Sequence, residues 1–144
     1  MELPVNIEAE RTVLGANLLR NELTGLCAES GLRPDHFSLS TNGEIYGVQL
    51  RLHNEGRPFD TCLLLEEMDV AKAGGFDYLS DLTRDVVLLE SHVLQRCRVL
   101  ILKSKLRKVV AVTAELQAAA CELGAKPEVI IKETIEKLNA ILED

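Results

Sequence analysis

The sequence predicts an all-α protein: a globular bundle of about five short helices over residues 1–88, then an antiparallel hairpin of long helices over residues 89–144. The apolar residues, 47% of the chain, are almost entirely aliphatic, because aromatic residues make up 3% and Trp is absent. Leu, Ala, Glu and Lys dominate, and these residues favour helix over strand. Gly and Pro recur through the first part, whereas residues 89–123 contain neither, which indicates short helices followed by one long helix.

The first two helices each begin at an Asn. Asn6 can accept the first free N–H groups of a helix over Asn6–Leu19. Apolar residues recur along this segment at helical spacing, namely Ile7, Val13, Leu14 and Leu18. Asn21 restarts a short helix over Asn21–Ala28, and Gly31 with Pro34 ends it.

The third helix is predicted from a capping pattern. Thr41 and Glu44 have the spacing at which the hydroxyl and the carboxylate satisfy each other's backbone donors at a helix start. The apolar positions that follow are Ile45, Val48 and Leu52. Gly56 and Pro58 then end this helix, because neither residue is tolerated well in a helix interior.

Two more short helices complete the predicted head. Asp60 can cap a helix over Thr61–Met68, since its carboxylate accepts backbone N–H groups of the first turn. Gly74 and Gly75 permit a tight turn before a last short helix. The apolar positions of that helix are Phe76, Leu79 and Leu82.

Two apolar stripes separated by a turn predict the hairpin. The first stripe, with steps of 3 and 4 residues, consists of Val99, Leu102, Leu106, Val109, Thr113, Leu116, Ala120 and Leu123. Heptad spacing of this kind places a stripe on one face of a helix. Gly124 supplies a left-handed stop, and Pro127 suits the first turn of the next helix. The stripe of the return helix is Ile131, Ile135, Leu138 and Leu142.

The two stripes are expected to form the seam of the hairpin, which leaves a second apolar face to be covered. That face consists of Leu100, Ile101, Val110, Val112, Ile130 and Ile141. Because large exposed apolar patches are unusual on a monomer, this face is a candidate self-association surface. The residues expected in the hairpin core and its pairing surface are Leu106, Val109, Val110, Leu116, Ile130, Ile131, Ile135 and Leu138. We expect Asp at Val110 or Ile130 to dissociate the pair while helicity is retained.

Charge is distributed unevenly along a chain of net charge −7. Residues 1–90 carry 7 Lys or Arg and 16 Asp or Glu, whereas residues 91–144 carry 9 and 7. The acidic first part is unsuited to binding a phosphate backbone. The second part contains a basic stretch: Arg96, Arg98, Lys103, Lys105, Arg107 and Lys108. This stretch is either a solvated helix face or the contact surface of a nucleic-acid-binding helical domain over Arg96–Lys108.

No catalytic, cofactor or metal site is expected. An NTP-driven motor needs a Gly-rich phosphate loop, and the pattern G-x-x-x-x-G-K-[ST] does not occur in the sequence. The histidines, His36, His53 and His92, lie in separate segments without a second ligand at metal spacing. The cysteines form no CxxC pair and are expected to be reduced, namely Cys27, Cys62, Cys97 and Cys121. The chain alone is therefore expected to catalyse nothing.

Hydropathy and the amino terminus indicate the compartment. No apolar run approaches the roughly 20 residues that a membrane-spanning helix needs. The first residues have neither the basic start nor the apolar core of a secretion signal. We therefore expect a cytoplasmic protein.

Four ordered motifs resemble the amino-terminal domain of DnaB-type replicative DNA helicases. They are Pro4 with Ile7-Glu8-Ala9-Glu10 and Leu14-Gly15-Ala16, then Leu32, Pro34 and Phe37, then Gly56, Pro58 and Asp60, and finally Gly74-Gly75 with Tyr78-Leu79 and Leu82. Within them, the residues expected to have structural roles are Pro4, Ile7, Glu8, Glu10, Leu14, Gly15, Pro34, Phe37, Gly56, Pro58, Asp60, Gly74, Gly75, Tyr78 and Leu79. Ser38 stands where the family commonly has an aromatic residue, and we expect this departure to change a partner surface on the globular head.

The resemblance implies that the whole chain is one such domain and that the ATPase motor of the family is absent from it. It also implies a scaffolding role for the domain. Domains of this family pair through hairpins and heads into a ring above a hexameric motor. The ring docks the carboxy-terminal domain of primase, and helicase loaders are further implied partners. For primase we expect contact at the hairpin tip, Leu123–Glu128. The alternative with the same fold is a free-standing phage or plasmid factor that regulates a helicase ring.

Overall fold

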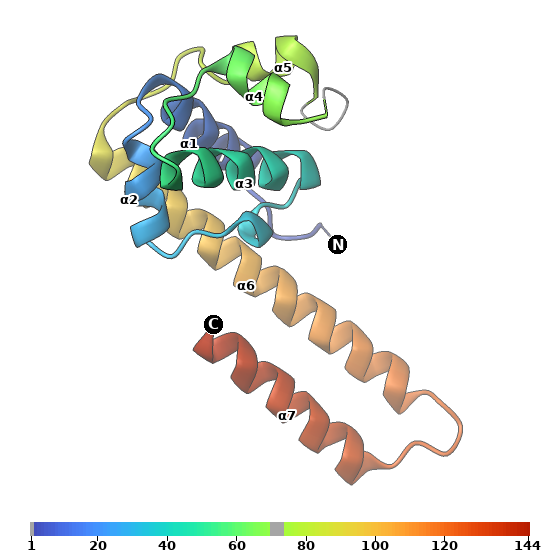
Figure 1. Ribbon diagram of the computed structural model, residues 1–144. Helices are drawn as coiled ribbons and strands as arrows, with labels where there is room; N and C mark the ends of the chain where they lie inside the picture. Colours follow the sequence, from blue (N-terminus) through green and yellow to red (C-terminus); the bar gives the residue numbers. More distant parts are fainter. Residues whose placement is uncertain (1, 70–73) are drawn as a thin grey trace. The chain divides into compact units, whose positions relative to one another are not determined.

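The computed structural model describes residues 2–69 and 74–144, and every regular element in these two ranges is a helix (Figure 1). The elements are α1 (Ile7–Leu19), α2 (Leu23–Glu29), the short η1 (Pro34–His36), α3 (Ser40–Asn54), α4 (Thr61–Glu67), α5 (Gly75–Asp81), α6 (Glu90–Ala120) and α7 (Pro127–Glu143). The all-α prediction is therefore confirmed. Among the described residues, no helix has the length and apolar character needed to cross a bilayer.

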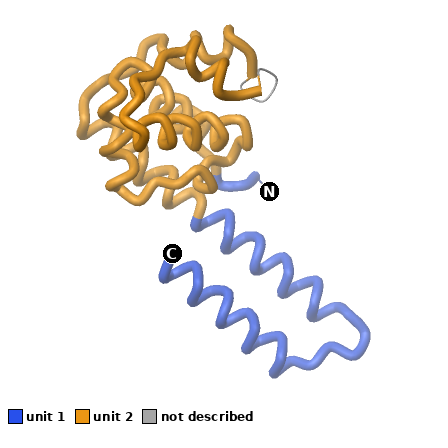
Figure 2. Tube along the Cα trace, in the orientation of Figure 1, with its two compact units in different colours: residues 1–4, 105–144 blue, residues 5–104 orange. Residues whose placement is uncertain are grey.

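The chain divides into two compact units (Figure 2). We call residues 5–104 the head unit, and residues 1–4 with 105–144 the hairpin unit. The long helix α6 contributes to both, because it begins at Glu90 and ends at Ala120. Five short α-helices precede it in the described part of the chain, as the Gly and Pro punctuation predicts.

The head unit is built on α1 and α3, which pack against each other. Leu14, Ile45 and Leu52 have no exposed surface, and burying each such side chain contributes roughly 1.5–3 kcal/mol. The other helices complete the core with Leu23, Cys27, Leu64, Leu79, Val93, Cys97 and Leu100. Leu100 is thus a core residue of the head unit rather than part of an uncovered hairpin face.

Buried polar side chains on α1 and α3 are satisfied by one another. Asn17 Nδ2 donates to Gln49 Oε1 at 3.1 Å, and Gln49 Nε2 donates to the Leu14 carbonyl at 3.1 Å. Asn21 joins the start of α2 to Phe59, because its side chain both donates to the Phe59 carbonyl and accepts from the Phe59 N–H. Buried polar groups are tolerated only when they are hydrogen-bonded, so these pairs fix how the helices pack.

Two predicted caps are confirmed and one is wrong. Asn6 Oδ1 accepts from Ala9 N, and Asp60 Oδ1 accepts from Leu63 N, each at 2.9 Å. The third helix, however, begins at Ser40 rather than at the Thr41 pattern. The segment before it is held by Glu10 of α1, which accepts from the backbone N–H groups of Ser38 and Leu39 and from the Asn42 side chain. A local pattern cannot reveal hydrogen bonds that tertiary packing supplies.

The hairpin unit consists of the second half of α6, the turn and α7, with the two helices antiparallel (Figure 2). Gly124 in the turn has φ +78°, a left-handed conformation that favours glycine, and Pro127 opens α7 as expected. Lys137 Nζ on α7 donates to Glu115 Oε2 on α6 at 2.8 Å, and Lys108 pairs with Asp144. The predicted hairpin is therefore confirmed.

Candidate functional site

The hairpin unit has an apolar face that its own two helices leave exposed. We define the outer face as the exposed apolar residues Leu106, Val109, Ile131, Ile135, Leu138 and Leu142. The exposed fractions of Ile131, Ile135 and Leu142 are 54%, 51% and 78%. A row of large aliphatic side chains so exposed is unusual on an isolated soluble unit, and it is typical of a surface that binds another protein.

The two helices meet along a different row. Val112, Leu116 and Ala119 of α6 lie against Ile130 and Thr134 of α7, around a space of about 30 Å³. All five side chains are half-buried. The two stripes therefore do not form the whole seam, because most of their residues within the unit are exposed. Val112 and Ile130, which the sequence places on the uncovered face, lie in the seam instead.

Apolar spacing cannot tell the two faces of the hairpin apart, because both carry apolar residues at the same steps of three and four. The inward face includes the small residues Ala119 and Thr134, whereas the stripes are dominated by Leu and Ile. The residues expected in the hairpin core and pairing surface therefore fall into two groups. Leu116 and Ile130 lie in the seam, and Val110 is half-buried. The outer face contains the rest, namely Leu106, Val109, Ile131, Ile135 and Leu138.

A second apolar feature lies at the turn of the hairpin. We call it the tip pocket, a space of about 270 Å³ lined by Leu116, Ala120, Ala125, Pro127, Ile130 and Ile131. It is smaller than the roughly 300–1,000 Å³ typical of small-molecule sites, so it suits an apolar side chain of a protein better than a metabolite. Leu123, next to it in sequence, has a wholly exposed side chain. Small residues at 120 and 125 create the space, a signal that the apolar periodicity does not reveal.

Ion pairs connect the two helices of the hairpin unit. The Glu115 carboxylate hydrogen-bonds to Lys137 and holds the pKa of that amine above its usual value. Arg107 Nη1 donates to the Pro4 carbonyl at 2.9 Å and so holds the amino-terminal residues on α6 within the hairpin unit.

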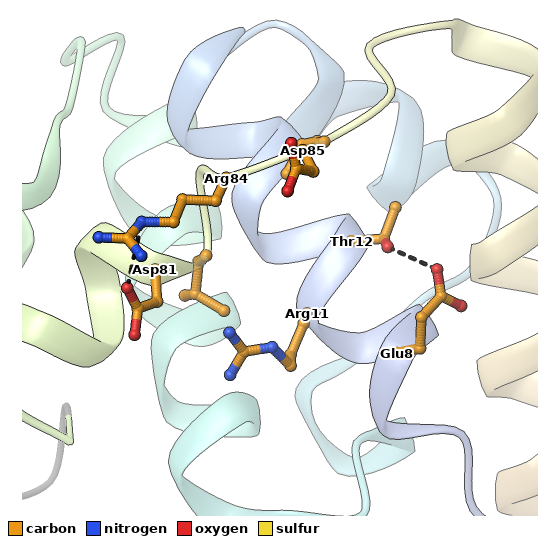
Figure 3. Close-up of a pocket in the computed structure, with 8 residues that line it drawn as sticks. Glu8, Arg11, Thr12, Asp81, Arg84 and Asp85 are labelled. Atoms are coloured by element: carbon orange, nitrogen blue, oxygen red, sulfur yellow. Dashed lines mark hydrogen bonds and ion pairs between the residues drawn. The ribbon is translucent and has the colours of Figure 1, made fainter.

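The head unit has a pocket of a different kind, between α1 and residues 81–86 (Figure 3). Its volume is about 370 Å³, and it is lined by Glu8, Arg11, Thr12, Asp81, Leu82, Arg84, Asp85 and Val86. Arg84 Nε lies 3.4 Å from Asp81 Oδ1, and Thr12 donates to Glu8 at 3.1 Å. The Arg11 guanidinium lies 5.2 Å from the centre of the Tyr78 ring, a cation–π distance.

The composition of this head pocket limits its chemistry. Acidic and basic groups are mixed in it, and most of them are exposed, so no carboxylate is placed in the dry surroundings that a general acid requires. In the described part of the chain, no group of three or more His, Cys, Asp or Glu could hold a metal ion. The pocket therefore suits polar contacts with another protein better than catalysis.

The motif residues of the first half have structural positions. Leu14, Phe37 and Leu79 are buried, while Pro34 opens η1. A methyl group at Gly15 would lie 1.8 Å from the Leu82 carbonyl oxygen, so only glycine permits this contact of α1. Glu10 is also buried, and Tyr78 is half-buried against the core. The remaining motif residues are half-buried or exposed, namely Pro4, Ile7, Glu8, Gly56, Pro58, Asp60, Gly74 and Gly75.

The basic stretch of α6 is partly neutralised by other groups. Arg96 Nε lies 3.4 Å from Glu8 Oε2 in the head unit. In the hairpin unit, Arg107 donates to the Pro4 carbonyl, and Lys108 pairs with Asp144. Three of the six basic side chains thus have partners within the protein, which reduces the positive charge available to a phosphate backbone.

Comparison with known sequences places these surfaces in a family context. A family model described as the DnaB-like helicase N terminal domain matches residues 2–101. The replicative DNA helicase DnaC of Bacillus subtilis is 36% identical over 87 residues, which cover 58% of this chain and 19% of that protein. The replicative DNA helicase DnaB of Buchnera aphidicola is 27% identical over 148 aligned positions, 99% of this chain and 32% of that protein. The chain thus spans a third or less of the length of these relatives.

Solved structures agree on the fold. The N-terminal domain of the DnaB helicase from Mycobacterium tuberculosis superposes with a TM-score of 0.84 at 23% identity, over 96% of this chain and 99% of that one. A DnaB-like replicative helicase, described together with its interactions with primase, superposes with a TM-score of 0.74 at 24% identity. That match covers 94% of this chain and 31% of the other.

Proposed function

Because the chain belongs to the family of DnaB-like helicase N-terminal domains, we propose that it is a protein-interaction and oligomerisation part of a replicative DNA helicase. In this proposal the outer face pairs with a second copy of the chain, and the tip pocket docks the carboxy-terminal domain of primase. ATP-driven unwinding would belong to a part of the parent helicase outside these 144 residues. We expect the assembly in the cytoplasm, with helicase loaders as further partners.

The exposed outer face is the observation that carries the pairing proposal. Ile131, Ile135 and Leu138 follow one another at steps of four and three along α7, so they present one continuous apolar row. A two-fold axis would lay this row against its own copy, because the same patch then meets itself. Burial of aliphatic surface stabilises such a pair by about 25 cal/mol per Å² of apolar area, before the entropy of association is subtracted.

A single charge in the outer face tests the pairing. We expect the unaltered chain to sediment as a pair at tens of micromolar and the Ile135→Asp variant to sediment as single chains, with helicity retained in circular dichroism. Asn139→Asp is the matched control, since it adds the same charge at an exposed position of the same helix. A single-chain mass for the unaltered protein, or pairing unaffected by Ile135→Asp, would contradict the proposal.

The tip pocket supports the primase proposal by its size and composition. Interfaces are usually anchored by one or two apolar side chains that fill a pocket, and Ala120, Ala125 and Pro127 border such a space. A DnaB-like helicase of the same fold is described with its interactions with primase. We therefore expect an apolar residue of the primase domain to enter the tip pocket, with Leu123 contacting it from the turn.

Calorimetric titration with the carboxy-terminal domain of primase from the same organism tests the docking. Ala125→Glu places a charge in the tip pocket and should weaken binding by at least about tenfold, the loss typical of a blocked interface anchor. Asn139→Asp, away from the turn, should bind as the unaltered chain does. Equal affinities for all three proteins would remove the tip pocket from the proposal and leave the pairing proposal untouched.

A further inference from the structure

The head pocket, between α1 and residues 81–86, is unused by either proposed interaction surface (Figure 3). All the residues that line it belong to the head unit. Its volume of about 370 Å³ exceeds the 270 Å³ of the tip pocket, so it has room for side chains of another protein. The charges of its lining indicate which side chains it would accept.

Three of the five charged side chains that line the head pocket already have a partner of opposite charge within the head unit. Arg84 Nε lies 3.4 Å from Asp81 Oδ1, so these two lining residues pair with each other. Glu8 Oε2 lies 3.4 Å from Arg96 Nε on α6. Paired charges attract a further ion only weakly, so the two remaining groups determine what the pocket binds.

Arg11 is the basic group of the pocket that has no acidic partner. Among the described residues, no carboxylate oxygen lies within 4.0 Å of its guanidinium nitrogens. Its guanidinium carbon lies 5.2 Å from the centre of the Tyr78 ring, and the Tyr78 hydroxyl donates to Asn42, which fixes the ring. A guanidinium stacked on a fixed ring keeps its N–H fork available, and a carboxylate can accept two parallel bonds from such a fork.

Asp85 is the acidic group without a basic partner among the described residues, and it is exposed. Its φ of +55° is left-handed, a conformation that Asp tolerates better than most residues and that persists only where the surroundings enforce it. Close packing on α1 enforces it here, since a methyl group at Gly15 would lie 1.8 Å from the Leu82 carbonyl oxygen and 2.9 Å from Val86 Cγ2. Arg11 and Asp85 therefore lie on the two packed elements that form the pocket (Figure 3).

We propose that the head pocket binds a segment of a partner protein that carries one acidic and one basic side chain on the same face. The acidic side chain pairs with Arg11 and the basic side chain pairs with Asp85. The lining has three carboxylates and two guanidinium groups, so its one net negative charge disfavours a phosphate dianion but not a segment without net charge. A segment with only one of the two charges would leave Arg11 or Asp85 unpaired, which lowers its affinity. The proposal requires neither pairing through the outer face nor docking at the tip pocket.

NMR titration of the 144-residue chain with a peptide tests the proposal. The probe is a helical peptide of Ala and Gln with one Glu and one Lys four residues apart, because such residues lie about 5–6 Å apart on one face. We expect saturable shifts of the Arg11 Nε–H signal and of the backbone amides of residues 84–86. Gln in place of the Glu or of the Lys of the probe should weaken binding by about three- to tenfold. Inorganic phosphate at the same ionic strength should leave these signals unchanged.

Variants of the chain assign each charge of the probe to its partner. With Arg11→Gln, loss of the Glu from the probe should have no further effect, because both changes remove the same contact. With Asp85→Asn, the same should hold for the Lys of the probe. Arg84→Gln is the matched control, since Arg84 already pairs with Asp81, and this variant should keep its sensitivity to both charges of the probe. Circular dichroism of each variant verifies that its helices are retained.

Three results would overturn the proposal. The first is a titration of the unaltered chain that does not saturate or that shifts other signals only, and this result depends on no variant. The second is equal binding of the probe and of its uncharged counterpart, or binding of phosphate at the same signals. The third is that the losses from Arg11→Gln and from removal of the Glu of the probe simply add.

Discussion

Glu10 of α1 holds the segment that leads into α3, because its carboxylate accepts a hydrogen bond from the backbone N–H of Ser38 at 2.9 Å. The same carboxylate accepts from the Ser38 hydroxyl, from Leu39 N at 3.4 Å and from Asn42 Nδ2 at 3.0 Å. Glu10 has no exposed surface, so its charge is balanced by these donors rather than by water. One acidic residue of the first motif thus orients α3, and through Asn42 it also reaches the hydroxyl of Tyr78.

Removal of the Glu10 carboxylate should be costly. Glu10→Ala leaves the buried donors of Ser38 and Asn42 without an acceptor, and we expect a loss of about 2–4 kcal/mol in the free energy of unfolding. Glu8→Ala, on the same helix but exposed, should cost less than about 1 kcal/mol. Urea denaturation of the three proteins measures both values. Equal losses would mean that the hydrogen bonds of the Glu10 carboxylate do not stabilise the start of α3.

A methyl group at Gly15 should disrupt the head unit. The added methyl would lie 1.8 Å from the Leu82 carbonyl oxygen, a backbone atom that no side-chain rotation can move. We therefore expect Gly15→Ala to lower the free energy of unfolding by about 2–4 kcal/mol or to prevent folding. Gly47→Ala is the control, because the nearest atom there, Pro34 Cγ, would be 3.7 Å away. That variant should gain about 0.5–1 kcal/mol from helix propensity. Thermal unfolding, followed by circular dichroism, should show a lower melting temperature for Gly15→Ala and a higher one for Gly47→Ala. A lower melting temperature for both variants, or for neither, would contradict these contacts.

Two isoleucines of α7 should separate the stability of the hairpin from its pairing. Ile130 lies in the seam, so Ile130→Ala should lower the stability of the single chain by about 1–2 kcal/mol. Ile135 is exposed, so Ile135→Ala should leave that stability nearly unchanged and weaken pairing instead. Chemical denaturation at low protein concentration and sedimentation at high concentration measure the two effects. If instead Ile135→Ala lowers the stability of the single chain and Ile130→Ala weakens pairing, the seam is formed by the two stripes and not by the row that includes Ile130.

Nucleic-acid binding is the alternative that the basic stretch raises. With Arg96, Arg107 and Lys108 already partnered, we expect fluorescence anisotropy to detect little binding of single-stranded or duplex DNA even at low salt. Lys105→Ala should not change that signal. Tight binding that weakens steeply with salt, and that Lys105→Ala reduces, would instead favour a DNA-binding domain.

The sequence predicts the helices well because most of their starts and stops are local. Asn6, Asp60, Gly124 and Pro127 act within a few residues of themselves, so a linear pattern is enough to place α1, α4 and α7. The start of α3 is different, since Glu10 is far from it in sequence. Only the folded arrangement brings that carboxylate to Ser38.

The candidate surfaces are less predictable for two physical reasons. Apolar spacing identifies both faces of the hairpin but does not decide which one becomes the seam, because both carry apolar residues at the same steps. The head pocket joins residues from distant parts of the chain, namely α1 and residues 81–86. No periodicity links such positions, so the pocket appears only once the head unit is packed.

Within residues 127–143, which are all described, no side chain of α7 is buried. A helix in that condition draws little stabilisation from its own chain, so the partner of the outer face would supply much of what keeps it folded. By mass action, the melting temperature of the hairpin should then rise with protein concentration. Association of subunits and folding of the hairpin would then be one equilibrium. The hairpin would fray at low protein concentration and be ordered at high protein concentration.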